Sequence, residues 1–311
     1  MTEAQRGVAA LVAACTLWGL SPLYWRLLNH VPPGELLAHR TLWSFVFFAG
    51  LMAAQGRLGA VRALLAGPAR GRVAAAAVFI TANWFLLILS VQWGMLTEAS
   101  LGYYIFPLLA VAIGVAAFGE RLRGPQALAI ALAAAGVGVL TVGLGAAPWI
   151  ALTMATTFAL YGAIKKRLVA GPVASVTAEV TLLALPAAAW IALVHAGWVS
   201  EGRAGGWLGQ GAGTTLLLLG SGPVTAVPLM LFTAASRRVS MATLGLGQYV
   251  NPTLQFLVAV AILAEPFTPW HMAAFALIWA AVAVYSTAGV VQDRAARRRR
   301  VSVGTSGTTE E

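Results

Sequence analysis

The chain has 311 residues, of which 59% are hydrophobic and 10% are charged, and its formal net charge is +10. Its mean hydropathy is +0.82. Because soluble domains carry about 25% charged residues, this composition excludes an ordinary soluble protein and indicates an integral membrane protein. A single cysteine, Cys15, excludes an intramolecular disulfide and a cysteine-based metal site.

Apolar stretches long enough to cross a bilayer recur along the chain. A helix needs about 20 apolar residues to span the hydrocarbon core, and lipid obliges each spanning backbone to satisfy its own hydrogen bonds. The ten predicted spans are 7–28, 34–54, 73–93, 99–118, 125–145, 148–168, 173–195, 213–234, 241–263 and 268–290. We therefore expect an all-α integral membrane protein with ten transmembrane helices.

Four residues of the first half recur in the second half after a constant spacing of 145 residues. The repeated pairs are Gly102 and Gly247, Tyr104 and Tyr249, Pro107 and Pro252, and Glu120 and Glu265. This repetition predicts two five-helix repeats, at 1–147 and 148–292, followed by a basic, disordered tail at 293–311. Because each repeat has an odd number of helices, the two copies must be inverted in the membrane.

The basic residues indicate the orientation of the chain. Seventeen of the 20 Lys and Arg residues fall at the N-terminus, in alternate loops and in the tail, all on one side of the predicted membrane. Only Arg26 and Arg203 fall on the opposite side, and Arg40 lies within a span. By the positive-inside rule, both termini are predicted to be cytoplasmic in a multi-pass protein of the cytoplasmic (inner) membrane.

Two charged residues lie inside predicted spans, where an ion costs roughly 2.5–3.5 kcal/mol on insertion scales. Arg40 lies in the second span and Glu179 in the seventh. Arg40 is a candidate for binding a substrate carboxylate or another anion, and Glu179 a candidate for binding a coupling proton or a substrate amine. Two structural alternatives stay open: Arg40 pairs with Glu35 or a helix-end carbonyl, and Glu179 extends toward the basic cluster at 165–167.

Uncharged polar and aromatic residues form a second set of candidates for substrate binding. They are Asn83, Trp84, Gln92, Tyr103, Tyr104, Gln248, Tyr249, Asn251 and Gln255. Three of them, in the ninth span, are spaced three and four residues apart and share one helix face. Pro107 and Pro252 lie at equivalent positions and are predicted hinges. Alternatively, these polar side chains only hold helices together, at roughly 0.6 kcal/mol each.

Several runs of residues resemble one transporter family. They are Trp18-Gly19 with Pro22 and Tyr24-Trp25; Glu35-Leu36-Leu37 with His39-Arg40 and Trp43-Ser44; and Ala99-Ser100-Leu101-Gly102-Tyr103 with Pro107 and Glu120-Arg121-Leu122. Together they resemble RarD-type permeases, which belong to the EamA-like branch of the drug/metabolite transporter superfamily. The resemblance extends over about residues 5–290, which is nearly all of the chain except the tail.

The resemblance implies an inner-membrane permease of ten helices in two inverted repeats, which moves small metabolites. The RarD name carries an association with chloramphenicol sensitivity but supplies no physiological substrate. One departure is Phe106, where the family pattern predicts Asn before the proline, as in Asn251-Pro252 of the second half. Loss of that amide in the first half predicts a more apolar substrate.

The leading functional hypothesis is a secondary transporter that moves a small organic metabolite or drug-like solute by alternating access. A lipid or amphiphile flippase and a non-transporting membrane partner protein are the alternatives. An enzyme is not expected, because no catalytic constellation is visible and the four histidines lack ligand-like spacing. No cofactor and no metal are predicted.

The remaining partner predictions concern the membrane. The Arg-rich segment at 294–300 follows the last span directly, so we expect it to contact anionic lipid and not nucleic acid. Glycines at 136, 138, 143 and 145 give the fifth span a smooth surface for close helix packing or for a homodimer contact.

Overall fold

The computed structural model describes residues 1–118, 124–199, 205–239 and 241–305. Within these ranges all regular secondary structure is helical. Outside the described residues lie Glu120 and its neighbours Arg121 and Arg123, and also Arg203, which the sequence places on the predicted external side.

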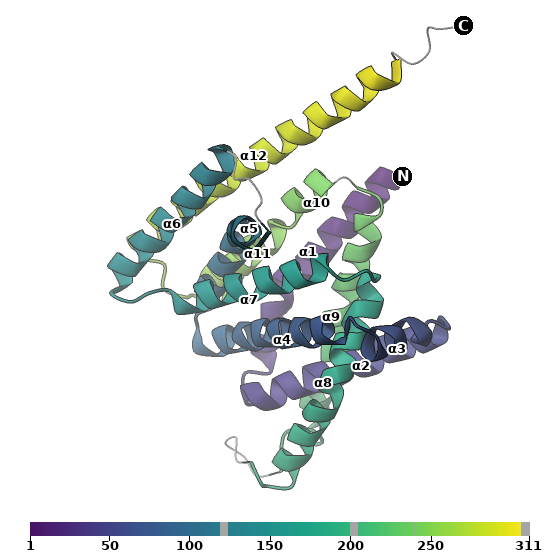
Figure 1. Cartoon of the computed structure of the whole chain (residues 1–311). Helices are drawn as coiled ribbons and strands as arrows, with labels where there is room; N and C mark the ends of the chain where they lie inside the picture. Colours follow the sequence, from purple (N-terminus) through teal and green to yellow (C-terminus); the bar gives the residue numbers. More distant parts are fainter. Residues whose placement is uncertain (119–123, 200–204, 240, 306–311) are drawn as a thin grey trace, which may run out of the picture.

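Thirteen helical elements follow one another in the described part of the chain (Figure 1). They are α1 (Glu3–Leu27), α2 (Pro33–Ala54), α3 (Leu58–Ala66), α4 (Arg70–Trp93), α5 (Leu96–Phe118), α6 (Gly124–Leu144), α7 (Trp149–Lys166), α8 (Pro172–His195), α9 (Ala212–Ser236), α10 (Met241–Gly247), α11 (Val250–Leu257), the π-helical η1 (Val258–Ile262) and α12 (Pro269–Thr305).

Eight helices of the described ranges are long and apolar enough to cross a membrane: α1, α2, α4, α5, α6, α8, α9 and α12. The protein is therefore an all-α, multi-pass membrane protein. The other two predicted spans are also helical, but α7 has 18 residues and ends in Lys165 and Lys166, and the span at 241–263 is divided among α10, α11 and η1. The count of ten spans accordingly stays a prediction.

The helix break between α10 and α11 has a local cause in Pro252. Proline has no N–H, so the carbonyl of Gln248 cannot receive the usual hydrogen bond from four residues ahead. That carbonyl instead accepts a bond from the N–H of Asn251 at 3.2 Å, and the N–H of Tyr249 bonds to the carbonyl of Leu246 at 3.2 Å. These tighter turns end one helix and start the next. The equivalent Pro107 lies inside the continuous helix α5.

Two elements differ from the sequence-based expectation in extent. The loop after the second span contains the short helix α3, whose Val61 and Leu64 are buried in a cluster with Ala174 and Ala178 of α8. At the other end of the chain, α12 continues as helix to Thr305, where a disordered tail was expected from residue 293. The Ala and Arg residues of this segment favour helix, which accounts for the continuation.

The helices pack in pairs that join the two halves of the chain. α1 packs against α9 and α11, and α7 packs against α4 and α5. α2 packs against α8 and α9, and α6 lies along α12, which then projects beyond the other helices (Figure 1).

Glycines permit two of the closest approaches between helices. A Cβ on Gly102 of α5 would lie 2.7 Å from the carbonyl oxygen of Ala151 in α7. A Cβ on Gly222 of α9 would collide with the backbone carbonyl of Trp43 in α2. Both contacts hold a helix of one half against a helix of the other half.

Candidate functional site

Arg40 of α2 lies at the meeting point of several helices and is 5% exposed. Its guanidinium carbon lies 4.7 Å from the ring centroid of Trp25 in α1 and 4.4 Å from that of Trp84 in α4. Its Nε donates a hydrogen bond of 3.1 Å to Oγ1 of Thr225 in α9. Tyr103 of α5 lies close enough to Arg40 for the two groups to interact electrostatically. Five helices from both halves therefore meet around one cation.

The guanidinium has no carboxylate partner among the described residues, within which no salt bridge to Arg40 is formed. The predicted alternative of a pair with Glu35 is not realised, because Glu35 accepts the Trp207 N–H at 2.6 Å and lies 3.7 Å from His39 Nε2. The two indoles contribute about 0.5–2 kcal/mol each by cation–π interaction. Nη1 of Arg40 is buried and has no hydrogen-bond partner.

A polar network fixes the side chains next to Trp84 and Tyr103. The Tyr103 hydroxyl donates to Oδ1 of Asn83 at 2.9 Å. Nδ2 of Asn83 donates to the Met154 carbonyl at 3.1 Å and to Oγ1 of Thr157 at 3.2 Å. Because Asn83 is 1% exposed, these bonds satisfy an amide that would otherwise be costly to bury. The network holds α4, α5 and α7 in register beside Arg40.

Tyr104 and Tyr249, the repeated tyrosines, lie in contact with each other. Their rings are stacked with centroids 6.1 Å apart and an interplanar angle of 13°. The Tyr104 hydroxyl lies 2.6 Å from Oγ1 of Thr253, and its ring meets those of Phe275 and Trp279 edge-on. This second group is an aromatic cluster between α5, the α10–α11 break and α12.

The remaining predicted binding residues lie outside both groups. Gln255 donates to Oδ1 of Asn251 at 3.0 Å, and Oε1 of Gln255 is buried without a partner. Gln92 donates to the Val31 carbonyl at 2.9 Å and so fastens the end of α4 to the turn after α1. Gln248 is partly buried at the helix break.

Glu179 of α8 is 1% exposed and is surrounded by donors. Lys165 Nζ lies 2.6 Å from Oε1 of Glu179, the Ser175 hydroxyl donates to the same oxygen at 2.9 Å, and the Tyr161 hydroxyl donates to Oε2 at 3.2 Å. The predicted contact with the basic cluster at 165–167 is therefore confirmed. The role of Glu179 as a proton carrier stays a prediction.

Three residues of importance were not among the predicted site residues. Trp25 and Thr225 complete the surroundings of Arg40. Glu265 caps α5, since its carboxylate accepts the N–H groups of Leu96 and Thr97 at 2.8 and 2.7 Å. Trp25 belongs to one of the runs that resemble the transporter family, so the sequence offered a reason to consider it. Thr225 is a threonine in an apolar span, and nothing in the sequence distinguishes it from other such threonines.

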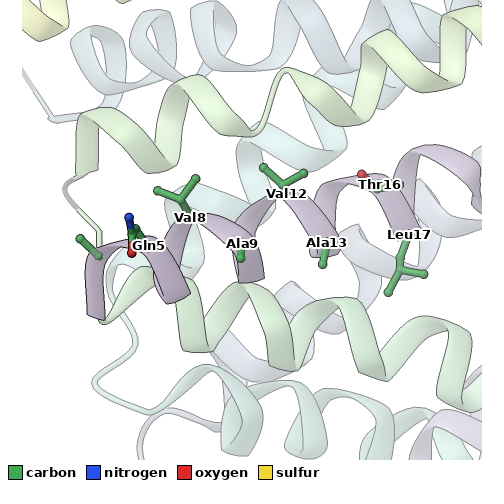
Figure 2. Close-up of a pocket in the computed structure, with 8 residues that line it drawn as sticks. Gln5, Val8, Ala9, Val12, Ala13, Thr16 and Leu17 are labelled. Atoms are coloured by element: carbon green, nitrogen blue, oxygen red, sulfur yellow. The ribbon is translucent and has the colours of Figure 1, made fainter. Parts of the chain in front are cut away.

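A shallow groove of about 870 Å³ runs along α1, and its lining is almost entirely apolar (Figure 2). Its lining consists of Ala4, Gln5, Val8, Ala9, Val12, Ala13, Thr16 and Leu17. Val8, Val12 and Leu17 are 42%, 47% and 45% exposed, as expected for a helix face turned toward lipid. In the part of the chain that the structure describes, no three His, Cys, Asp or Glu side chains are grouped as a metal site.

Comparisons with known proteins place this geometry in context. The model of the EamA-like transporter family matches residues 5–142. The protein RarD of Streptomyces exfoliatus is 40% identical over 99% of this chain and 95% of its own length. An uncharacterized transporter of Vibrio cholerae is 37% identical over 96% of this chain and 97% of its own. A crystal structure at 22% identity shares the fold, with a TM-score of 0.56 over 89% of this chain and 96% of that one.

Proposed function

Because this chain belongs to the RarD-type permeases of the EamA-like transporter family, we propose that it moves a small organic metabolite or drug-like solute by alternating access. The proposed setting is the cytoplasmic (inner) membrane, with both termini cytoplasmic. The proposed architecture is ten spans in two inverted repeats. In this architecture α7 and the broken α10–α11–η1 segment are the two spans that are added to the eight long apolar helices of the described residues.

The observation that carries this proposal is that the helices of one half pack against helices of the other half in a matching pattern. In the proposed repeats α1 corresponds to α7, α2 to α8, α4 to α9, α5 to α10–α11 and α6 to α12. The contacts of α1 with α9 and α11 then have their counterparts in those of α7 with α4 and α5. The pairs α2–α8 and α6–α12 join corresponding helices directly. Such an arrangement supports an inverted repeat with two nearly equivalent packings, each open to one side.

The proposed substrate site centres on Arg40, Asn83, Trp84 and Tyr103, where helices of both repeats meet. Tyr104, Tyr249, Gln248, Asn251 and Gln255 are proposed to line the path beside the helix break, with Gln92 at its end. Pro107 and Pro252 are the proposed hinges, and Glu179 the proposed proton-coupling residue.

Transport is tested by comparing intracellular and external metabolites in cells that overproduce the wild type with cells that produce a folded Arg40→Ala variant at the same level. A compound redistributed only by the wild type is the expected result. Absence of any redistributed compound across a broad panel contradicts transport of small solutes.

Alternating access is tested with single cysteines in a Cys15→Ala background. Thr225→Cys places a thiol beside Arg40, and Leu185→Cys, at a position 78% exposed within α8, is the lipid-facing control. Membrane-impermeant maleimides added from either side should label position 225, and neither should label position 185. Labelling of position 225 from one side only contradicts alternating access.

A second candidate function is movement of lipid or another amphiphile, favoured by the open, apolar groove along α1, whose lining residues are drawn in Figure 2. This function predicts that proteoliposomes accelerate transbilayer movement of a fluorescent phospholipid. Val12→Asp, in the groove, should abolish the acceleration, and Leu185→Asp, on a different lipid-facing helix, should leave it unchanged.

A further inference from the structure

We propose that Arg40 and its two tryptophans bind the carboxylate of the transported solute, and that the solute is a small organic monocarboxylate with an apolar remainder. This inference rests on the proposed transport function, since it names the substrate class of that same site. It goes further than a general anion preference, because the surroundings of Arg40 restrict both the charge and the shape of what binds there.

The first step is the charge balance of the described acids. None of the five acids whose side chains the structure describes forms an ion pair with Arg40. Glu3 pairs with Arg6 and Arg238, Glu35 accepts the Trp207 N–H, Glu179 pairs with Lys165, and Glu265 caps α5. Glu98 lies beside the backbone of Ile150, and its Oε2 is buried without a hydrogen-bond partner. The positive charge of Arg40, 5% exposed, is therefore left for a group that the described protein does not supply. An anion is the group that neutralises it.

The second step is the direction from which an anion reaches the guanidinium. The guanidinium carbon lies over two indole rings, 4.7 and 4.4 Å from their centroids, and Nε donates its hydrogen bond to Thr225. The terminal nitrogens are the remaining donors, and Nη1 is buried and lacks an acceptor. A carboxylate fits these nitrogens because its two oxygens match the fork of N–H donors in one plane.

The third step concerns other buried atoms of α1 and α2 that have no hydrogen-bond partner. Trp25 Nε1, Trp43 Nε1 and Ser44 Oγ are also buried without hydrogen-bond partners, and both indole nitrogens are donors only. Tyr103, by contrast, already donates to Asn83. The two indole nitrogens, one on α1 and one on α2, thus favour a ligand that offers hydrogen-bond acceptors.

The fourth step sets the net charge at minus one. Arg40 is a single cation, and Lys165, a basic residue of the interior, is already paired with Glu179. A dicarboxylate or a phosphate would bring a second negative charge without a second cation among the described groups of this site. An amino acid would bring an ammonium to a site whose described acids are engaged elsewhere. The surrounding tryptophan and tyrosine rings suit an apolar or aromatic body.

Binding is tested with purified full-length protein in nanodiscs and with ligand pairs that differ only in charge: benzoate against benzamide, and phenylacetate against phenylacetamide. Isothermal titration should find the carboxylate bound about 10- to 100-fold more tightly than its amide. Arg40→Gln should abolish this preference, and Arg62→Gln, an exposed charge on α3, should leave it unchanged. Equal affinity of the wild type for acid and amide overturns the proposal. Because this measurement uses the wild type alone, it does not depend on whether any variant folds.

The class of anion is tested by competition. Inorganic phosphate, succinate and phenylalanine should displace benzoate weakly, and tight binding of any of the three overturns the assignment to monocarboxylates. Uptake of radiolabelled benzoate and of neutral solutes into proteoliposomes separates the two proposals. A carboxylate preference without uptake of any solute supports the anion site and contradicts transport. Uptake of neutral solutes by a protein without that preference supports transport and overturns the anion site.

Discussion

The buried pair of Lys165 and Glu179 gives a prediction whose magnitude follows from the structure. Glu179 is 1% exposed and Lys165 20% exposed, with 2.6 Å between Nζ and Oε1. Removing one member of a buried pair costs about 3–5 kcal/mol, because the other charge stays buried. Lys165→Met leaves the carboxylate with only its hydroxyl donors, so we expect a loss of about 3 kcal/mol. Glu179→Gln should cost about 2 kcal/mol, since the lysine keeps some contact with solvent.

The double variant Lys165→Met with Glu179→Gln removes both charges and should lose only about 2 kcal/mol, less than the sum of its parts. The assay is unfolding in detergent followed by tryptophan fluorescence, in a double-mutant cycle with Arg62→Gln as a surface control. The expected interaction energy is on the order of 3 kcal/mol. Losses that simply add in the double variant would refute the reasoning that the two charges stabilise each other.

The same variants test whether Glu179 carries a coupling proton. A purely structural pair predicts that the double variant, once folded, transports with the pH dependence of the wild type. Proton coupling through Glu179 predicts that every variant with Gln at this position loses that dependence, including the double variant. Uptake at a series of external pH values decides between the two outcomes.

Three further predictions concern helix ends, close contacts and hinges. Glu265→Ala should destabilise the protein by about 3 kcal/mol in thermal unfolding, because two buried N–H groups lose a charged acceptor. Glu265→Gln should destabilise it by about 1 kcal/mol. Equal losses in the two variants would contradict a role for the charge. Gly222→Ala should cost about 1–3 kcal/mol, whereas Gly138→Ala, where a Cβ meets nothing within 4 Å, should be neutral or stabilising. Pro252→Ala and Pro107→Ala should change turnover more than substrate binding in proteoliposome uptake, and an equal loss of binding would count against hinges.

The helices that hydropathy alone can locate were predicted well. α1, α2, α4, α8 and α9 lie where apolar spans were expected, because hydrophobic length and internal backbone hydrogen bonding fix such helices with little help from tertiary contacts. The break at residues 248–249 was not located, although Pro252 was identified, because hydropathy does not register which carbonyl loses its partner. The short helix α3 was missed because its stability comes from packing on α8.

The sequence identified candidate site residues, but it did not show which of them lie together. Mid-span polarity directed attention to Arg40, and the structure brings Trp84 into contact with it and joins Tyr103 to Asn83 by a hydrogen bond. The partner Thr225 is separated from Arg40 by 185 residues in sequence, and periodicity within one helix cannot reveal such a neighbour. The spacing of Gln248, Asn251 and Gln255 predicted a shared helix face, but such spacing cannot indicate how far these residues lie from Arg40.

Arg40 and Glu179 lie at similar places in their helices but have different surroundings. Each lies seven residues after the proline that begins its helix, Pro33 in α2 and Pro172 in α8, and these two helices pack together. Glu179 has its charge neutralised by Lys165, whereas Arg40 contacts aromatic rings and a threonine and has no acidic partner among the described residues. Under the proposed inverted arrangement, one half thus holds a satisfied charge and the other a charge that an incoming anion satisfies. Under that proposal, binding energy is available mainly on the Arg40 side, so the two proposed repeats would respond unequally to the substrate.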